Sequence, residues 1–264
     1  MSKTSWLIVI TSSDHSAGLF LSHTAANRAI ELVNYRDMPK IDKLYDIVYL
    51  RDPFTDVWVM TTLRSVDDFT ERHPNAYYVD KVKTSDDLLI EDKWRQYLQL
   101  SAYMPHTQLL SEVKELPVQP IIKKRISARA RDVYFDPDDV QGDRADYITQ
   151  PLIAIIEEYR VYTLGGEVLP QMVRRSSKTP TSKIKAVEAV PLSALVGDFC
   201  KNILKNLPGY DLLGFDVAIT SEGPILIEVN RSPQFARFME MTGCDIAGQL
   251  IDSVERGIDF MHQK

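Results

Sequence analysis

Near the C-terminal end of the sequence, a predicted β-hairpin over residues 214–230 carries oxygen-bearing side chains at a spacing that suits a metal site. Strand side chains alternate between the two faces of a sheet with a period of two. A three-residue loop at 221–223, with its glycine in the left-handed conformation, would join the two strands. This register places Asp216 opposite Glu228, with Asn230 two residues further along the same face.

Two interpretations of this polar face fit the pattern equally well. Mg²⁺ prefers one or two carboxylates, with waters and nucleotide phosphates completing its octahedron. The alternative is the solvated face of an antiparallel sheet, where carboxylates are common. Two details favour the metal: Asp216 and Glu228 would repel each other unless a cation lies between them, and Asn230 leads into a polar turn at 231–234. The opposite, buried face is predicted to hold Phe215, Val217, Ile219, Ile225, Ile227 and Val229.

The N-terminal part of the sequence reads as an alternation of strands and helices. An apolar run at 6–11 predicts a strand, followed by a helix near 18–33 and a second strand at 46–51. Residues 57–61 fit either a third strand or the start of a helix. This βαβ alternation predicts a small parallel-sheet lobe over residues 1–80.

The rest of the chain predicts a mixed lobe and then a lobe rich in antiparallel strands. Capping residues and an acidic first turn open one helix, and a Gly-Gly pair between two strand-like runs is typical of a hairpin. The expected elements are a helix at 84–104, a strand at 120–126, a strand within 146–156, a hairpin at 159–169, a helix at 191–207 and a helix at 246–261.

Composition excludes several classes of protein. The formal net charge is −6, with 31 Lys and Arg against 37 Asp and Glu, which gives no electrostatic footprint for nucleic acid. No apolar stretch is long enough for a transmembrane helix or a signal peptide, so we expect no membrane partner. Two unpaired cysteines and scattered histidines fit a cytoplasmic chain without a zinc site. Only 11 residues are glycine, and neither common glycine-rich nucleotide motif is present.

The hairpin residues resemble a known signature. Asp216 followed by the sequence Glu-Val-Asn-Arg-Ser-Pro at 228–233 looks like the metal-binding pattern of the ATP-grasp superfamily. The likeness is to the carboxylate–amine ligase type, which includes D-alanine–D-alanine ligase, glutathione synthetase and the peptide-type amino-acid ligases. It covers about residues 80 to 240, and the N-terminal lobe is similar to the α/β domain that precedes the ATP-grasp region in this family.

The resemblance implies an α/β (α+β) chain with the ATP-grasp fold. It implies a small N-terminal parallel α/β lobe at 1–80, a central ATP-grasp lobe at 81–155 and a C-terminal ATP-grasp lobe with the metal-binding hairpin at 156–264. The nucleotide would lie between the last two lobes. The implied cofactors are ATP and Mg²⁺, with two magnesium ions in the site and Mn²⁺ as an alternative metal.

The resemblance also assigns nucleotide contacts. Lys93 matches a lysine that touches the phosphates, although a solvated helix lysine is the plain alternative. Lys123, in an otherwise apolar strand, matches the lysine that reaches the α- and β-phosphates, and its charge there needs an anion or water. Lys124 stands at the usual proline position.

A hinge strand supplies the expected contacts to adenine and ribose. Gln150 and the backbone of Leu152 match the adenine site, and Glu158 matches the acidic residue near the ribose hydroxyls. Glu157 is the neighbouring candidate, with an exposed turn as its alternative.

The chain departs from the family pattern in the loop that normally covers the phosphates with glycine amides. Residues 125–132 contain no glycine. Arg125, Arg129 and Arg131 would replace backbone amides by side-chain charge. Alternatively, the loop is stiffer or folds over an acidic partner.

A second departure is Gly214, because the family often has an arginine at this position. The candidates that would compensate are Arg174, Arg175, Arg231 and Arg237. As catalytic arginines we expect Arg160, Arg174 and Arg231, with Arg160 reaching phosphate or the substrate carboxylate. A Ser/Thr/Lys-rich segment containing Lys178, Lys183 and Lys185 is expected near the γ-phosphate.

The activity implied by the resemblance is ATP- and Mg²⁺-dependent ligation of a carboxylate to an amine through an acyl phosphate, with an amino acid or peptide as substrate. Loop residues Ser12, Ser13 and Arg51 are expected to contact it, because binding groups gather at strand ends. The alternatives are a non-catalytic nucleotide-binding or scaffold protein with this fold, or a related enzyme with a thiol acceptor. Homodimers are common among such folds, but the sequence assigns no interface.

Overall fold

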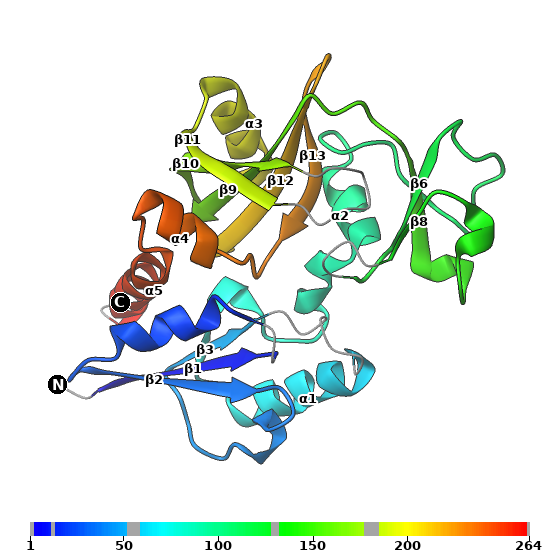
Figure 1. Cartoon of the computed structure of the whole chain (residues 1–264). Coiled ribbons are helices and arrows are strands. Elements are labelled where there is room, and N and C mark those ends of the chain that lie inside the picture. Colours follow the sequence, from blue (N-terminus) through cyan, green and yellow to red (C-terminus); the bar gives the residue numbers. More distant parts are fainter. Residues whose placement is uncertain (1–2, 12–13, 52–58, 128–131, 177–184, 263–264) are drawn as a thin grey trace.

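The structure is a computed structural model, and it describes residues 3–11, 14–51, 59–127, 132–176 and 185–262. Three β-sheets follow one another along the chain (Figure 1). The N-terminal sheet is parallel, whereas the central and C-terminal sheets are antiparallel. The predicted α/β fold class is therefore confirmed.

The strands of the N-terminal sheet stand in the order β2-β1-β3-β4. Their bounds are Thr4–Ile10 (β1), Arg28–Asn34 (β2), Ile47–Leu50 (β3) and Tyr77–Tyr78 (β4). The central sheet has the order β5-β8-β6-β7. Its strands are Gln108–Leu109 (β5), Pro120–Lys124 (β6), Val133–Tyr134 (β7) and Tyr147–Pro151 (β8). The C-terminal sheet has the order β11-β10-β9-β12-β13. Its strands are Glu157–Leu164 (β9), Glu167–Ser176 (β10), Lys185–Pro191 (β11), Leu212–Thr220 (β12) and Gly223–Asn230 (β13).

Five α-helices are described: Val59–Arg72 (α1), Lys93–Leu100 (α2), Ala194–Leu204 (α3), Ala236–Thr242 (α4) and Ile246–His262 (α5). Short 3₁₀ helices join the elements: Ala17–His23 (η1), Met38–Lys40 (η2), Val79–Lys81 (η4), Asp87–Glu91 (η5), Pro137–Asp139 (η6) and Arg144–Asp146 (η7). None of the helices in the described part of the chain combines the length and apolar character needed to span a membrane.

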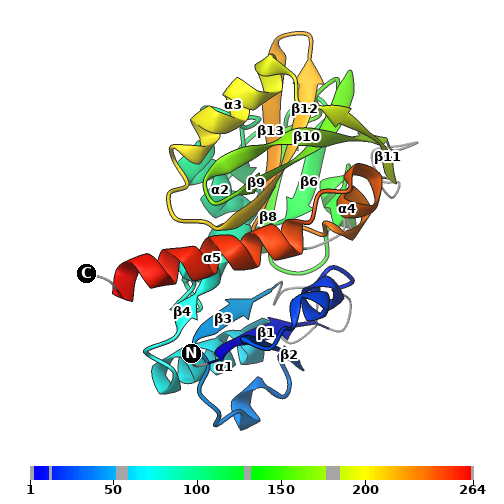
Figure 2. The same ribbon diagram turned by 90° about the vertical axis from the view of Figure 1, so that its left-hand side faces the viewer.

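Helix α5 lies between the N-terminal and C-terminal sheets (Figure 2). Its residues Leu250 and Val254 share one buried cluster with Trp6 and Ile8 of β1 and with Tyr162 of β9. Burying both sides of an apolar helix against two sheets is a strongly stabilising arrangement, because most of the free energy of folding comes from removing apolar surface from water. The helix therefore holds the two sheets in a fixed relation.

The other faces of these sheets have their own cores. Helix α1 covers the second face of the N-terminal sheet, where Val66 and Phe69 pack with Leu7 and Val48. On the C-terminal sheet, α2 and α3 contribute Leu100 and Cys200 to a cluster with Phe215. A smaller cluster around Ile122 supports the central sheet.

Most of the expected elements are present, but two expectations were wrong. The helix expected near 18–33 is the short helix η1 followed by strand β2, which is only partly buried along its length and pairs with β1 in parallel. An edge strand of this kind is set by a partner far along the chain rather than by its own periodicity. Residues 57–61 include the start of α1 at Val59; residues 52–58 lie outside the described part.

The long helix expected at 84–104 is divided into η5 and α2. Asp92 interrupts it with an extended backbone, and its side chain accepts a hydrogen bond from the N–H of Trp94. Asp is a favoured N-cap residue because its carboxylate satisfies an otherwise unpaired helix N–H. The three sheets fall within residues 4–78, 108–151 and 157–230; the lobe boundaries given above stay a prediction.

Candidate active site

The predicted register of the β12–β13 hairpin is confirmed, because Asp216 pairs with Glu228. The expected three-residue loop was wrong. Thr220 pairs with Gly223, so the turn has two residues, and the register then shifts by one residue next to Asp216, which makes Ile227 an additional residue of β13. A shorter turn and a β-bulge together give the same pairing as the longer loop.

The bulge changes which side chains of β13 are buried. Leu226 and Val229 are buried, whereas Ile225 and Ile227 are only partly so, which corrects the expected apolar row. Bulges bend a strand and re-aim its side chains, and they are common beside active sites. Here the bulge lies immediately before Glu228.

Two arginines contact Asp216. The Arg160 guanidinium donates from Nε to Oδ1 and from Nη2 to Oδ2 of Asp216, the latter over 2.8 Å, and Arg175 forms a second ion pair with the same carboxylate. Arg175 also lies 3.2 Å from Glu158. Burial opposes the charge on Asp216, but the two arginines hold the pKa of that carboxyl below its usual value. Burial raises the pKa of Glu158.

Lys123 extends from β6 toward this acidic group. Its Nζ donates to Oε1 of Gln150 over 2.9 Å. Burial lowers the pKa of Lys123 to about 8, with the carboxylate of Glu228 opposing the shift and the ammonium of Lys93 adding to it. These electrostatic couplings show that the two predicted lysines and the predicted carboxylates converge, although they come from different sheets.

The start of α2 and the end of β6 are joined by several bonds. The N–H of Lys93 donates to the carbonyl of Arg125, and its Nζ donates to the carbonyl of Ser127, both over 3.0 Å. The Arg125 guanidinium contacts the buried Asp92 carboxylate at 2.6 Å. The expectation that Arg125 meets the phosphates is therefore replaced by a contact that anchors the base of this loop to α2.

The hinge residues are held by the protein itself. Gln150 is buried and donates from Nε2 to the hydroxyl of Thr107 over 2.8 Å. The N–H of Leu152 donates to the carbonyl of Gln119 over 2.8 Å. A nucleotide that used this N–H would have to replace that bond.

Adjacent arginines on β10 face opposite sides of the sheet, as expected for a strand. Arg175 pairs with Glu158 across the β9–β10 ladder, on the side of Asp216, whereas Arg174 forms ion pairs with Glu157 and Glu188. The structure thus brings Arg175, and not the predicted Arg174, to the carboxylate cluster.

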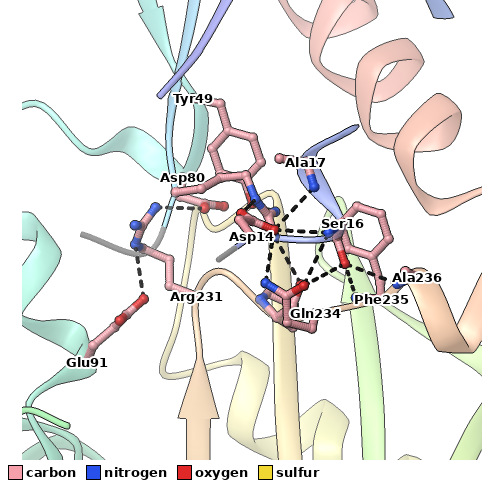
Figure 3. A network of polar contacts seen from close by, with 12 residues as sticks. Asp14, Ser16, Ala17, Tyr49, Asp80, Glu91, Arg231, Gln234, Phe235 and Ala236 are labelled. Carbon is pink, nitrogen blue, oxygen red and sulfur yellow. Dashed lines mark hydrogen bonds and ion pairs between the residues drawn. The ribbon is translucent and has the colours of Figure 1, made fainter. Parts of the chain in front are cut away.

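Arg231 was predicted as a catalytic residue, but the structure encloses it between lobes (Figure 3). Its side chain is fully buried, with Nη1 3.5 Å from Asp80 and Nε 3.7 Å from Glu91. A guanidinium sealed in this way cannot contact a substrate without a rearrangement of the interface. Arg237, the remaining candidate, forms an exposed ion pair with Glu240.

A second buried network lies beside Arg231 (Figure 3). The Arg51 guanidinium donates to the Asp14 carboxylate over 2.6 Å, and neither side chain is exposed. Gln234 donates to Asp14 over 2.9 Å, and Arg51 donates to the carbonyl of Pro233 over 3.2 Å. Arg51, predicted as a substrate contact, instead ties the N-terminal lobe to the segment that follows β13. Sequence reasoning missed this network; the available signal was a charged residue after each of two parallel strands.

Packing explains why glycine stands at position 214. A Cβ atom there would come within 2.7 Å of Cβ of Pro233 and 3.3 Å of Cδ of Arg160. The turn after β13 therefore packs directly on β12, and the space that a larger residue would need is occupied.

Several predicted contacts lie outside the described residues, or their side chains do. These are Ser12, Ser13, Arg129, Arg131, Lys178, Lys183 and Lys185.

The residues around Asp216 fit an oxygen-ligated divalent cation. Asp216 and Glu228 face each other across the ladder, and the side-chain Nδ2 of Asn230 is buried with no hydrogen-bond partner among the described residues. Two carboxylates with an amide oxygen are the kind of donors that Mg²⁺ takes. Within the described residues, no three His, Cys, Asp or Glu side chains gather as a metal site; the proposed set differs in having only two carboxylates.

Comparisons with known proteins agree with this geometry. A family model described as the RimK-like ATP-grasp domain matches residues 140–254. A probable alpha-L-glutamate ligase of Shewanella halifaxensis is 28% identical over 108 residues, which make up 39% of this chain and 23% of that protein. The solved structure of a RimK domain ATP-grasp protein from Sphaerobacter thermophilus has a TM-score of 0.69 at 15% identity, covering 95% of this chain and 99% of its own.

Two further solved structures are similar over nearly the whole chain. The D-alanine–D-alanine ligase of Bacillus anthracis in complex with ATP has a TM-score of 0.65 at 15% identity, with 97% of each chain covered. The ATP-grasp ligase PsnB, complexed with a minimal precursor, has a TM-score of 0.64 at 19% identity, covering 95% of this chain and 98% of its own.

These matches confirm the resemblance inferred from the residues: the chain has the ATP-grasp fold. The aligned part spans about a quarter to a third of the length of the curated relatives named first among the matches.

Proposed function

We propose that this chain is an ATP- and Mg²⁺-dependent ligase that activates a carboxylate as an acyl phosphate and joins it to an amine, releasing ADP and phosphate. The observation that carries the proposal is the convergence of Lys93, Lys123, Arg160 and Arg175 on the carboxylates of the β12–β13 hairpin. Such a group neutralises the charge on a transferring phosphoryl group, which is most of what this chemistry requires of a protein.

The roles of the residues follow from their places. Lys93 and Lys123 hold the nucleotide phosphates, while Arg160 and Arg175 stabilise the oxygens of the phosphoryl group and the acyl phosphate. A substrate carboxylate oxygen attacks the γ-phosphorus as the bond to ADP breaks. The amine then attacks the acyl carbon, phosphate leaves, and the amine loses a proton.

A divalent cation would be held by Asp216, Glu228 and Asn230, where it would supply charge neutralisation at the phosphates. In the ligand-free protein, the guanidinium groups of Arg160 and Arg175 compensate the charge of Asp216. Gln150, Glu158 and the backbone of Leu152 are proposed to contact adenine and ribose.

The proposed substrates are amino acids or peptides. The curated relative is named a probable alpha-L-glutamate ligase, and PsnB was solved with a precursor; these names make L-glutamate and acidic peptides the first compounds to test. A mass-spectrometric assay with ATP, Mg²⁺ and a panel of amino acids and peptides should give ADP and a condensed product. Nucleotide binding without any Mg²⁺-dependent product would argue against the proposal.

Neighbouring arginines provide a matched test of the site. Arg175→Met should lower turnover by about 100-fold, because a charge that stabilises the transition state is removed. Arg174→Met, one residue away on the opposite face of β10, should retain turnover within about threefold, since an exposed ion pair contributes little. Equal losses in both variants would contradict the assignment.

The non-catalytic alternative is favoured by one observation, the contact of Arg125 with Asp92, which withdraws one of the charges expected to replace the glycine amides. Calorimetry with ATP and Mg²⁺ followed by a turnover assay separates the two functions, because binding without turnover supports the alternative. A thiol acceptor in place of an amine would be recognised from the mass of the product.

A further inference from the structure

The side chain of Gln96 in α2 makes a paired hydrogen-bond contact with the backbone of β13. It is buried, with 1% of its surface exposed. Its Oε1 accepts from the N–H of Val229 over 2.9 Å, and its Nε2 donates to the carbonyl of Val229 over 2.8 Å. Nε2 also donates to the carbonyl of Ile90 over 2.9 Å. The amide thus bonds Val229 as a residue of a neighbouring strand would.

Strand β13 needs such a contact because it is the last strand of its sheet. Its only neighbour in the described sheet is β12, and the ladder to β12 is interrupted by the bulge at Ile227. On the open side, the carbonyl of Tyr103 accepts from the N–H of Leu226 over 2.7 Å. The α2 segment therefore holds β13 on both sides of the bulge, at Leu226 and at Val229.

Val229 lies between two of the proposed metal ligands, Glu228 and Asn230. Fixing the N–H and the carbonyl of one residue fixes the peptide planes on both of its sides, because each peptide unit is planar. The helix that carries Gln96 also begins with Lys93, whose Nζ lies at the base of the phosphate loop.

We propose that Gln96 is a positioning residue that sets the geometry of Glu228 and Asn230 and couples it to Lys93, an inference that rests on the proposed function. Only an amide supplies both the donor and the acceptor that Val229 requires. Gln96 does not itself touch metal or nucleotide. Partners outside the metal ligands commonly tune metal affinity by about 10- to 100-fold.

The test compares Gln96→Met with Gln99→Met. Gln99 lies on the exposed side of the same helix, where its Nε2 donates to the carbonyl of Asn206, so the control makes the same chemical change away from β13. Electron paramagnetic resonance measures the binding of Mn²⁺ in the presence of ADP, and calorimetry measures the binding of ADP alone. Circular dichroism establishes that each variant is folded.

The expected result is a loss of about tenfold or more in Mn²⁺ affinity for Gln96→Met, with the affinity for ADP alone unchanged within about threefold. Gln99→Met should match the wild type in both. Wild-type Mn²⁺ binding by Gln96→Met, or an equal loss of metal-free ADP binding, would overturn the inference.

If Gln96→Met does not fold, Gln96→Glu replaces it, because the carboxylate keeps the acceptor for the N–H of Val229 and removes only the donor. The same selective loss of Mn²⁺ affinity is expected, and its absence overturns the inference. A wild-type chain that binds neither Mn²⁺ nor ADP would instead overturn the proposed function, which distinguishes the two failures.

Discussion

Asp216 shows how the charges of this site are arranged at the level of single residues. A buried carboxylate beside another carboxylate is unfavourable unless cations compensate it, and Arg160 and Arg175 do so in the absence of any ligand. Lys123 is in the opposite situation: its ammonium is partly desolvated, and it bonds only a neutral amide, that of Gln150, among its described hydrogen-bond partners. An anion placed beside Lys123 would therefore be bound strongly.

Lys123 should take up a proton when nucleotide binds. Burial lowers its pKa to about 8, so about half of the side chains are neutral at pH 8. Because nearby phosphates favour the charged form, the pKa of Lys123 rises on binding. Calorimetry at pH 8 in two buffers of different ionisation enthalpy should report a fractional proton uptake.

At pH 6.5 the contribution of Lys123 should vanish, because the side chain is already charged in the free protein. The Lys123→Met variant should lack the uptake at pH 8. An uptake of equal size in the variant would show that another group is responsible.

At the scale of elements, α2 is the part on which the site is assembled. Its first residue, Lys93, lies at the end of β6, and Gln96 holds β13. Asp92 caps the helix and also receives Arg125, so the position of α2 relative to β6 depends on one buried carboxylate. This contact replaces the glycine-rich loop geometry that the family normally has.

Arg125→Met should therefore loosen the start of α2. The buried Asp92 carboxylate loses its cationic partner, and we expect a loss of about 2 kcal/mol in the free energy of unfolding and a higher KM for ATP. Urea unfolding and steady-state kinetics measure both. Lys124→Met changes the neighbouring cation, on the opposite face of β6, and should alter neither by a comparable amount; equal effects would contradict the role of Arg125.

Much of the hairpin was predictable, whereas its details were not. The pairing of Asp216 with Glu228 followed from strand alternation, but a longer loop and a shorter turn with a bulge at Ile227 give the same pairing, and no local signal separates them. Strand β2 was taken as a helix because its partner, β1, lies far away in the sequence. The choice between Arg174 and Arg175 depended on the register of a ladder, which alternation alone does not fix.

At the scale of the whole molecule, buried polar groups join the N-terminal lobe to the segment that follows β13. The hydroxyl of Ser16 accepts from the N–H groups of Phe235 and Ala236 at the start of α4, over 2.8 and 3.1 Å. With the Arg51–Asp14 pair, this contact places the loop after β1 directly beside the metal-binding strand. The position of Arg231 could not be inferred from its motif, because it is set by Asp80 and Glu91 from other elements.

The Arg51–Asp14 pair should contribute strongly to stability once it is broken. Arg51→Met or Asp14→Asn leaves a buried charge without its partner, so each change should lower the free energy of unfolding by about 3–5 kcal/mol. The double variant should lose less than the sum, because both changes remove one interaction. Urea unfolding of the four proteins completes the cycle, with Lys40→Met, in an exposed ion pair, as a control expected to change little. Additive losses would mean that the two residues act independently.

Asp80 should make the interface between the lobes sensitive to pH. Burial raises its pKa to about 7, with Arg231 opposing and Asp211 adding to the shift. Because the folded protein binds this proton more tightly than the unfolded chain, the Asp80 contribution to stability is largest at low pH and falls as the pH rises from about 4 to 7. Asp80 has a positive φ of 61°, a conformation that asparagine also tolerates. Asp80→Asn should therefore remove this part of the slope, so that the variant gains stability relative to the wild type between pH 5 and pH 8 in urea unfolding. Asp42→Asn, at an exposed carboxylate, should leave the slope unchanged, and parallel curves for Asp80→Asn and the wild type would show that Asp80 does not titrate in this range.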